Sequence, residues 1–173
     1  MKRLLLLRHA KAVPGGGSDD FERELTARGR EDAPKLGTYI RQQRYTPDTI
    51  VASPARRTME TVELATDEFN GTRRVDYLEP LYLAEPELIL SIVRLALDKT
   101  KTLMVVGHNP GLEQIATFLA REPVKRKERD RFDLIEEKFP TAALAVLDFD
   151  VARWRDVGQG QGVLKDFVRP RDL

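Results

Sequence analysis

Three short runs dominated by apolar residues constrain the fold of this chain more than any other feature. They cover residues 4–7, 49–52 and 103–106. Runs of this length and continuity are typical of strands buried on both faces of a sheet. Because such strands need helices on both sides, the sequence predicts an α/β protein with a mostly parallel sheet.

Amphipathic segments between and after these runs supply the helices. Their apolar stripes are Ala33, Leu36 and Ile40; Thr58, Val62, Ala65 and Phe69; Leu88, Ile89, Ile92, Val93 and Ala96; and Leu112, Ile115, Ala116 and Leu119. Thr26 is placed to cap the first helix, and Pro86 stands at the favoured first position of the third. Strands that alternate with helices predict a three-layer α/β/α sandwich.

The C-terminal part is predicted to hold a charged excursion and two more strands. Residues 121–139 are highly charged and lack apolar periodicity, so we expect them outside the sheet. They would form either a lid or partner-docking segment, or a solvated helix or loop. Residues 142–149 and 163–168 are predicted strands, joined through the turn region 158–162 as a hairpin on the sheet edge. Trp154, near this connection, is expected to serve packing.

Composition bounds the class of protein. A chain of 173 residues is expected to form one domain, residues 1–173. Its 29 basic residues nearly cancel its 28 acidic ones, so we expect it to bind neither nucleic acid nor membranes. Any anion site must then be local. We also expect a monomer. The absence of cysteine excludes disulfides and thiolate nucleophiles and agrees with a cytoplasmic location.

The N-terminal leucines are predicted to form a strand and not a secretory leader. The apolar run after Met1-Lys2-Arg3 is interrupted at Arg8-His9, short of the length that a leader needs. No later segment has the apolar length needed to span a bilayer.

A polar or charged cluster follows each of the three strongest predicted strands. The clusters are Arg8-His9, residues 53–57 (SPARR) and residues 107–110 (GHNP). Because ligands bind at the carboxyl ends of strands in open parallel sheets, the clusters should meet at one edge. Ser53-Pro54 and Asn109-Pro110 each resemble a helix cap followed by proline, so two helix N-termini would face that edge. With the guanidinium groups of Arg8 and Arg57, these features predict a phosphate site.

The chain has two histidines, His9 and His108, and both lie in these clusters. Their placement favours a functional role for both. Zinc is the competing role for a histidine pair, but the chain lacks cysteine and any closely spaced His-Glu or His-His motif. We therefore expect no metal and no other cofactor.

These clusters resemble the signature motifs of the histidine phosphatase superfamily, which includes the phosphoglycerate mutases, and most resemble those of SixA-type phosphohistidine phosphatases. The matching motifs are residues 7–12 (LRHAKA), 25–29 (LTARG), 53–58 (SPARRT), 107–110 (GHNP) and 139–142 (FPTA). The resemblance therefore spans most of the chain. It implies a phosphoglycerate mutase-like fold with one antiparallel strand. In this family an arginine lies four residues after the serine, which selects Arg57 and leaves Arg56 facing solvent.

The resemblance also implies catalytic roles for Arg8, His9, Arg57 and His108. Neutral His9 would attack phosphorus in line and form a phosphohistidine that water hydrolyses. Arg8, Arg57 and His108 would bind the phosphoryl oxygens of the substrate and stabilise the transition state. The expected activity is that of a metal-independent phosphatase acting on a phosphorylated protein, with phosphohistidine as the preferred group.

Two alternatives remain open. Larger family members carry a carboxylic acid after the third strand, and segment 78–85 does not match its motif. If Glu85 faced the pocket as a general acid, the protein would be a phosphomonoesterase acting on a small phosphorylated metabolite. Otherwise Glu85 interacts with the dipole of its own helix. The second alternative, a non-catalytic phosphate-binding regulatory module, is disfavoured because His9 and its three partners are all present.

Substrate specificity is expected to come from residues 13–24 and 121–139. The glycine-rich run at 15–18 is followed by Asp19-Asp20, where a phosphate loop would need lysine and a hydroxyl residue. We therefore expect this run to form a mobile loop at the mouth of the site.

Overall fold

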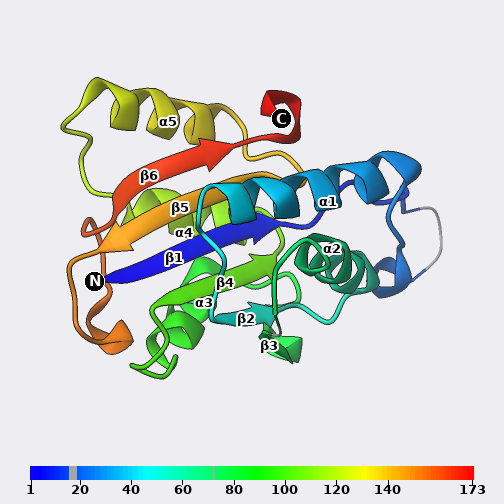
Figure 1. The fold of residues 1–173 in the computed structure, drawn as a ribbon, viewed down its shortest axis with the longest axis horizontal. Helices are drawn as coiled ribbons and strands as arrows, with labels where there is room; N and C mark the ends of the chain where they lie inside the picture. The colour runs from blue at the N-terminus through cyan, green and yellow to red at the C-terminus, as the bar shows by residue number, and fades with distance from the viewer. Residues whose placement is uncertain (16–18, 72) are drawn as a thin grey trace.

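The computed structural model of the chain describes residues 1–15, 19–71 and 73–173. Its centre is a six-stranded sheet of order β3-β2-β4-β1-β5-β6 (Figure 1). The strands are β1 (Lys2–Arg8), β2 (Thr49–Ala52), β3 (Arg74–Tyr77), β4 (Thr102–Gly107), β5 (Leu144–Phe149) and β6 (Val163–Val168). In the described sheet only β5 runs against the others, pairing antiparallel with both β1 and β6. This arrangement confirms the predicted mostly parallel sheet with one antiparallel strand.

Helices cover both faces of the sheet, which confirms the three-layer sandwich (Figure 1). α1 (Ala27–Gln42) and α2 (Arg56–Thr66) pack against the face that carries Leu5 and Leu7 of β1. α3 (Pro86–Arg94), α4 (Gly111–Leu119) and α5 (Arg126–Glu137) pack against the face that carries Leu4 and Leu6. All four leucines are fully buried, and each contributes about 1.5–3 kcal/mol by leaving water. None of the described helices is long and apolar enough to cross a membrane.

Two helices begin where the sequence predicts. The Thr26 side chain accepts a hydrogen bond from the Gly29 amide at 3.1 Å and caps α1. Pro86 occupies the first turn of α3. Gly29 also permits a close approach, because a Cβ there would lie 2.2 Å from the Lys11 carbonyl oxygen. The first turn of α1 is therefore packed directly on the segment that follows His9.

The other two predicted starts were wrong. α2 begins at Arg56 and α4 at Gly111, in each case later than the Ser-Pro or Asn-Pro pair suggested. Ser53 Oγ accepts from the Ala55 amide at 3.2 Å and lies within 2.7 Å of His108 Nε2. Asn109 precedes a cis peptide bond to Pro110, and its Oδ1 accepts from the Glu113 amide at 3.2 Å. The Ser53 side chain stabilises the turn ahead of α2, whereas that of Asn109 accepts from an amide in the first turn of α4.

The C-terminal predictions are confirmed in outline. The charged segment contains α5, which lies outside the sheet and packs against β6. Strands β5 and β6 pair antiparallel, and β6 is an edge strand. Trp154 lies in the connection between them, fully buried, and its Nε1 donates to the Thr100 carbonyl at 2.8 Å. Edge strand β3 was not predicted, because none of its residues is fully buried and it has no apolar run.

Candidate active site

The four predicted site residues meet at the carboxyl edge of the sheet. Arg8 ends β1 and His9 follows it, Arg57 lies in the first turn of α2, and His108 follows β4. They line one hollow of about 260 Å³. We call it the phosphate pocket; its lining is Arg8, His9, Lys11, Ala12, Asp20, Arg23, Arg57, Leu83, His108, Asn109 and Thr141.

His9 is held as a neutral ring with one unprotonated nitrogen. The side chain is buried, and Nδ1 lies 2.8 Å from the carbonyl oxygen of Ala10. Because a carbonyl can only accept, Nδ1 carries the proton and Nε2 keeps its lone pair. Burial lowers the pKa of His9 to about 3, and the positive charges of Arg57 and Arg8 act in the same direction. At neutral pH, His9 Nε2 is therefore available as a nucleophile.

His108 takes the opposite tautomer. Its Nδ1 lies 3.3 Å from Nη2 of Arg57, which can only donate, so Nδ1 accepts. The proton must be on Nε2, which donates to the fully buried Ser53 hydroxyl at 2.7 Å. Burial, reinforced by Arg57, lowers the pKa of His108 to about 4. The sequence predicted Ser53 as a helix cap and missed its role in fixing this ring.

Arg57 connects the two histidines. Its side chain is 3% exposed, and its Nε donates to His9 Nε2 at 3.3 Å. The Arg56 side chain is 50% exposed and pairs with Glu24 and Glu60 at 2.9 and 3.2 Å. Arg57 therefore faces the pocket and Arg56 faces solvent, as the motif spacing predicts.

Two arginines of the pocket have a buried nitrogen without a hydrogen-bond partner among the described residues. These atoms are Nε of Arg8 and Nε of Arg23. Arg8 is anchored through Nη1, which donates to the Phe139 carbonyl at 2.9 Å. A buried donor without an acceptor costs about 1–3 kcal/mol. The guanidinium groups of these arginines are the type of donor that binds an anion with several acceptor oxygens.

Asp20 is a pocket residue that the sequence reasoning missed. It begins the short turn η1 (Asp20–Glu22), and its Oδ2 accepts from the Tyr82 hydroxyl and from Arg57 Nη2, the latter at 3.2 Å. The hydrogen bond from Tyr82 has the largest effect and, together with Arg57, lowers the pKa of Asp20. Asp20 is the single carboxylate that lines the pocket in the described part of the chain, and it is ionised. The expected mobile loop at 15–18 lies largely outside the described residues, which resume at Asp19.

Glu85 does not enter the pocket. It precedes α3, is exposed, and makes no capping hydrogen bond with its side chain. Leu83, two residues earlier, lines the pocket instead. The condition that would have made Glu85 a general acid is therefore not met.

The described residues contain no group of three or more histidine or carboxylate side chains that could hold a metal ion. The charges that face the pocket are instead those of Arg8, Arg23, Arg57 and Lys11, with Asp20 as the counter-charge.

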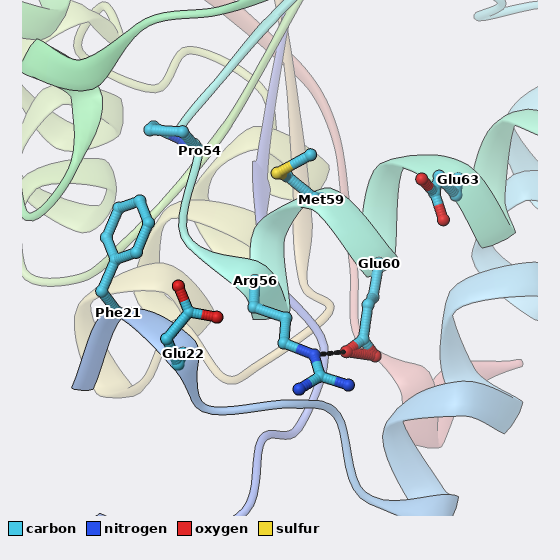
Figure 2. A pocket seen from close by; sticks show the side chains of 7 residues that line it. All are labelled: Phe21, Glu22, Pro54, Arg56, Met59, Glu60 and Glu63. Carbon is cyan, nitrogen blue, oxygen red and sulfur yellow. Dashed lines mark hydrogen bonds and ion pairs between the residues drawn. The ribbon is translucent and has the colours of Figure 1, made fainter. Parts of the chain in front are cut away.

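A second hollow, of about 300 Å³, adjoins the pocket across η1 and the start of α2. Figure 2 shows Phe21 and Glu22 on the segment of η1, with Arg56, Met59, Glu60 and Glu63 on α2. The lining of this hollow contains three carboxylates and one arginine. We call Glu22, Glu60 and Glu63 the acidic flank.

The fold and this site define a class of protein. A mostly parallel sheet with two histidines and two arginines gathered at its carboxyl edge is the phosphoglycerate mutase-like arrangement. The family model described as histidine phosphatase superfamily (branch 1) matches residues 4–81. An uncharacterised protein of Mycobacterium tuberculosis is 33% identical over 165 residues, which covers 95% of this chain and 100% of that protein.

Solved structures agree over nearly the whole length. A structure from Agrobacterium tumefaciens named for the phosphohistidine phosphatase SixA is 31% identical, with a TM-score of 0.76 and 98% of each chain covered. A structure of the same name from Nakamurella multipartitia is 28% identical, with a TM-score of 0.83, covering 98% of this chain and 96% of that one. The chain belongs to the histidine phosphatase superfamily. Within it, the chain is of the SixA type, and it is a phosphatase.

Proposed function

We propose that this protein hydrolyses phosphohistidine through a phosphoryl intermediate on His9. The observation that carries the proposal is the neutral His9 ring, whose unprotonated Nε2 lies 3.3 Å from Arg57 Nε in a pocket rich in arginine. The similarity to SixA structures supports the same reaction class. The substrate would be a phosphorylated protein.

The reaction takes two steps. His9 Nε2 attacks phosphorus in line, the P–N bond to the substrate histidine breaks, and the leaving imidazole takes a proton from solvent at its other ring nitrogen. Water then attacks phosphorus, the bond to His9 breaks, and inorganic phosphate leaves. Arg8 and Arg57 stabilise the charge on the equatorial oxygens in both steps. The Nδ1 hydrogen bond to Ala10 keeps the correct tautomer of His9 throughout.

Among the described residues, the pocket has no protonated carboxyl group, which favours phosphohistidine over an alkyl phosphate. An alkoxide is a strong base and needs a proton in the transition state, whereas an imidazole leaves more easily. Asp20, the carboxylate of the pocket, is ionised and accepts from Tyr82 and Arg57, so it cannot supply that proton. Glu85 lies outside the pocket lining. The metabolite phosphatase alternative therefore loses its general acid.

The test is to trap the intermediate. We expect alkaline quench during turnover, followed by mass spectrometry, to locate phosphate on His9, because a phosphoramidate survives alkali. His9→Ala should abolish both the label and the activity. Normal turnover by His9→Ala would disprove the mechanism, and binding without turnover by the wild type would favour the regulatory module.

A substrate series tests the leaving-group argument. We expect kcat/KM to fall from phosphohistidine to aryl phosphate to alkyl phosphate, and Glu85→Gln to change none of these values much. An efficient alkyl phosphatase that Glu85→Gln disables would instead establish the metabolite phosphatase.

A further inference from the structure

A third hollow opens directly beside the phosphate pocket. Its volume is about 220 Å³, and it shares Lys11 and Thr141 with the pocket. Its lining is Lys11, Arg28, Asp32, Pro140, Thr141, Arg169, Pro170 and Arg171. The topology explains this placement. Strand β6 runs in the same direction as β1, so the C-terminal turn η4 (Pro170–Asp172) arrives at the edge of the sheet where β1 ends.

This hollow is strongly basic, with four cationic side chains and one carboxylate. We call Lys11, Arg28, Arg169 and Arg171 the basic flank. The one carboxylate, Asp32, lies 3.4 Å from Nε of Arg28, whose side chain is 65% exposed. At such exposure an ion pair contributes less than about 1 kcal/mol. The positive charge of the hollow is therefore only partly compensated.

Two cationic side chains of the flank have no partner in the described part of the chain. Arg169 is held by Asp172 through both Nε and Nη2, each at 3.0 Å. Lys11 and Arg171 are exposed, and neither side chain has a hydrogen bond or ion pair with any part of the chain that the structure describes. Arg28 lies in the first turn of α1, where the helix dipole favours negative charge, and that turn has no acidic residue. An anion in this hollow would relieve these unfavourable interactions.

The geometry points to a second anion site at the basic flank, which binds a negatively charged group of the same substrate whose phosphoryl group occupies the phosphate pocket. This inference rests on the proposed function, because it places the reacting phosphoryl group beside His9. The acidic flank gathers three carboxylates around Arg56 (Figure 2) and shares no lining residue with the phosphate pocket, whereas the basic flank shares Lys11 with it, so the Lys11 side is the favourable one for an anionic group.

The ligand chemistry is that of a phosphate or carboxylate tethered to the reacting phosphoryl group. An arginine that is free to move can grip either group with two parallel hydrogen bonds. Two sources carry such a group: an acidic residue beside the phosphohistidine of a protein, and a small molecule with two phosphates.

Binding of phosphonates, which are not hydrolysed, tests the site independently of turnover. The probes are phenylphosphonate and a series of alkane bisphosphonates of increasing length, measured by calorimetry on the wild type, Arg171→Gln and Arg155→Gln. Arg155 is an exposed arginine in η3 (Trp154–Asp156), which follows the far end of β5, so its substitution removes the same charge at the opposite edge of the sheet. Arg171 does not line the phosphate pocket.

We expect one bisphosphonate to bind more tightly than phenylphosphonate, and Arg171→Gln to remove up to about five-fold of its affinity. Arg155→Gln should leave both affinities unchanged, and Arg171→Gln should leave that of phenylphosphonate unchanged. Peptides with phosphohistidine flanked by glutamate or by glutamine form the second arm. A glutamate preference that Arg171→Gln abolishes identifies a protein substrate, and an effect on bisphosphonates alone identifies a small molecule.

No gain from a second anionic group in either arm would overturn the site, as would an equal loss for phenylphosphonate in Arg171→Gln. Because phosphonates report binding alone, a protein that shows the predicted contrast but never forms phospho-His9 would refute the proposed function and retain the site.

Discussion

The neighbours Arg56 and Arg57 offer a matched test of the pocket, because they differ in orientation and not in chemistry. Arg57 donates to His9, to His108 and to both the backbone and side chain of Asp20, at 2.8–3.3 Å. Removing one such donor from a developing charge typically costs about 10²–10³ in rate, or about 2.7–4 kcal/mol. We expect Arg57→Ala to lose at least this much in kcat/KM.

Arg56 makes contacts of a different kind. Its exposed ion pairs with Glu24 and Glu60 are worth about 0.2–1 kcal/mol each, and they act on stability. Arg56→Ala should therefore keep kcat/KM within several-fold of the wild type while its Tm falls slightly. Arg57→Lys should fall between wild type and Arg57→Ala, because lysine keeps the charge but cannot replace the planar fork.

The assay is steady-state hydrolysis of an aryl phosphate, whose leaving group needs no proton, with circular dichroism to confirm the fold of each variant. Equal losses from Arg56→Ala and Arg57→Ala would refute the assignment of the phosphate clamp to the inward-facing residue.

Three further predictions follow from the site. Ser53→Ala leaves the buried Nε2–H of His108 without its acceptor, so we expect a stability loss of about 1–3 kcal/mol and a lower kcat. The control Ser91→Ala removes an exposed hydroxyl and should change neither quantity. Urea unfolding measures the stability, and steady-state kinetics measure kcat. In the folded protein the pKa values of His9 and His108 are about 3 and about 4, whereas an unfolded histidine has a pKa of about 6.5. Below pH 6.5 the unfolded chain therefore binds more protons than the folded one, and the free energy of unfolding should fall as the pH drops towards 4. The fall is at most about 1.4 kcal/mol per pH unit for each ring. His9→Asn should reduce this slope in urea titrations at several pH values, and an unchanged slope would contradict the burial of a neutral His9. Exhaustive chelation should leave activity intact, and a loss that zinc or magnesium restores would overturn the arginine-based mechanism.

The sheet and the convergence of the main site residues were predictable because they depend on local pattern and one topological rule. The buried runs at 4–7 and 103–106 have no polar face, which identifies central strands. The carboxyl ends of parallel strands then bring His9, Arg57 and His108 together. Strand β3 escaped notice because half-exposed residues at an edge carry no apolar run.

Asp20 and the role of Ser53 could not be found in this way. The place of Asp20 depends on contacts with Arg57 and Tyr82, which are 37 and 62 residues away in the chain. Ser53 precedes a proline, so its local pattern indicates a helix cap, but the buried ring of His108 provides a tertiary hydrogen bond that the pattern does not reveal. In both cases long-range contacts override the local signal.

The three strands β2, β4 and β1 lead into Ser53, His108 and His9, respectively, and lie side by side in the middle of the sheet. Amides of central strands exchange with solvent only when most of the structure opens, whereas peripheral turns open locally at a smaller free energy. The floor of the phosphate pocket should therefore show the slowest hydrogen exchange in the molecule, and the rim turns η1 and η4 much faster exchange. Mutations in those turns can change which molecules are admitted without loosening the residues beneath.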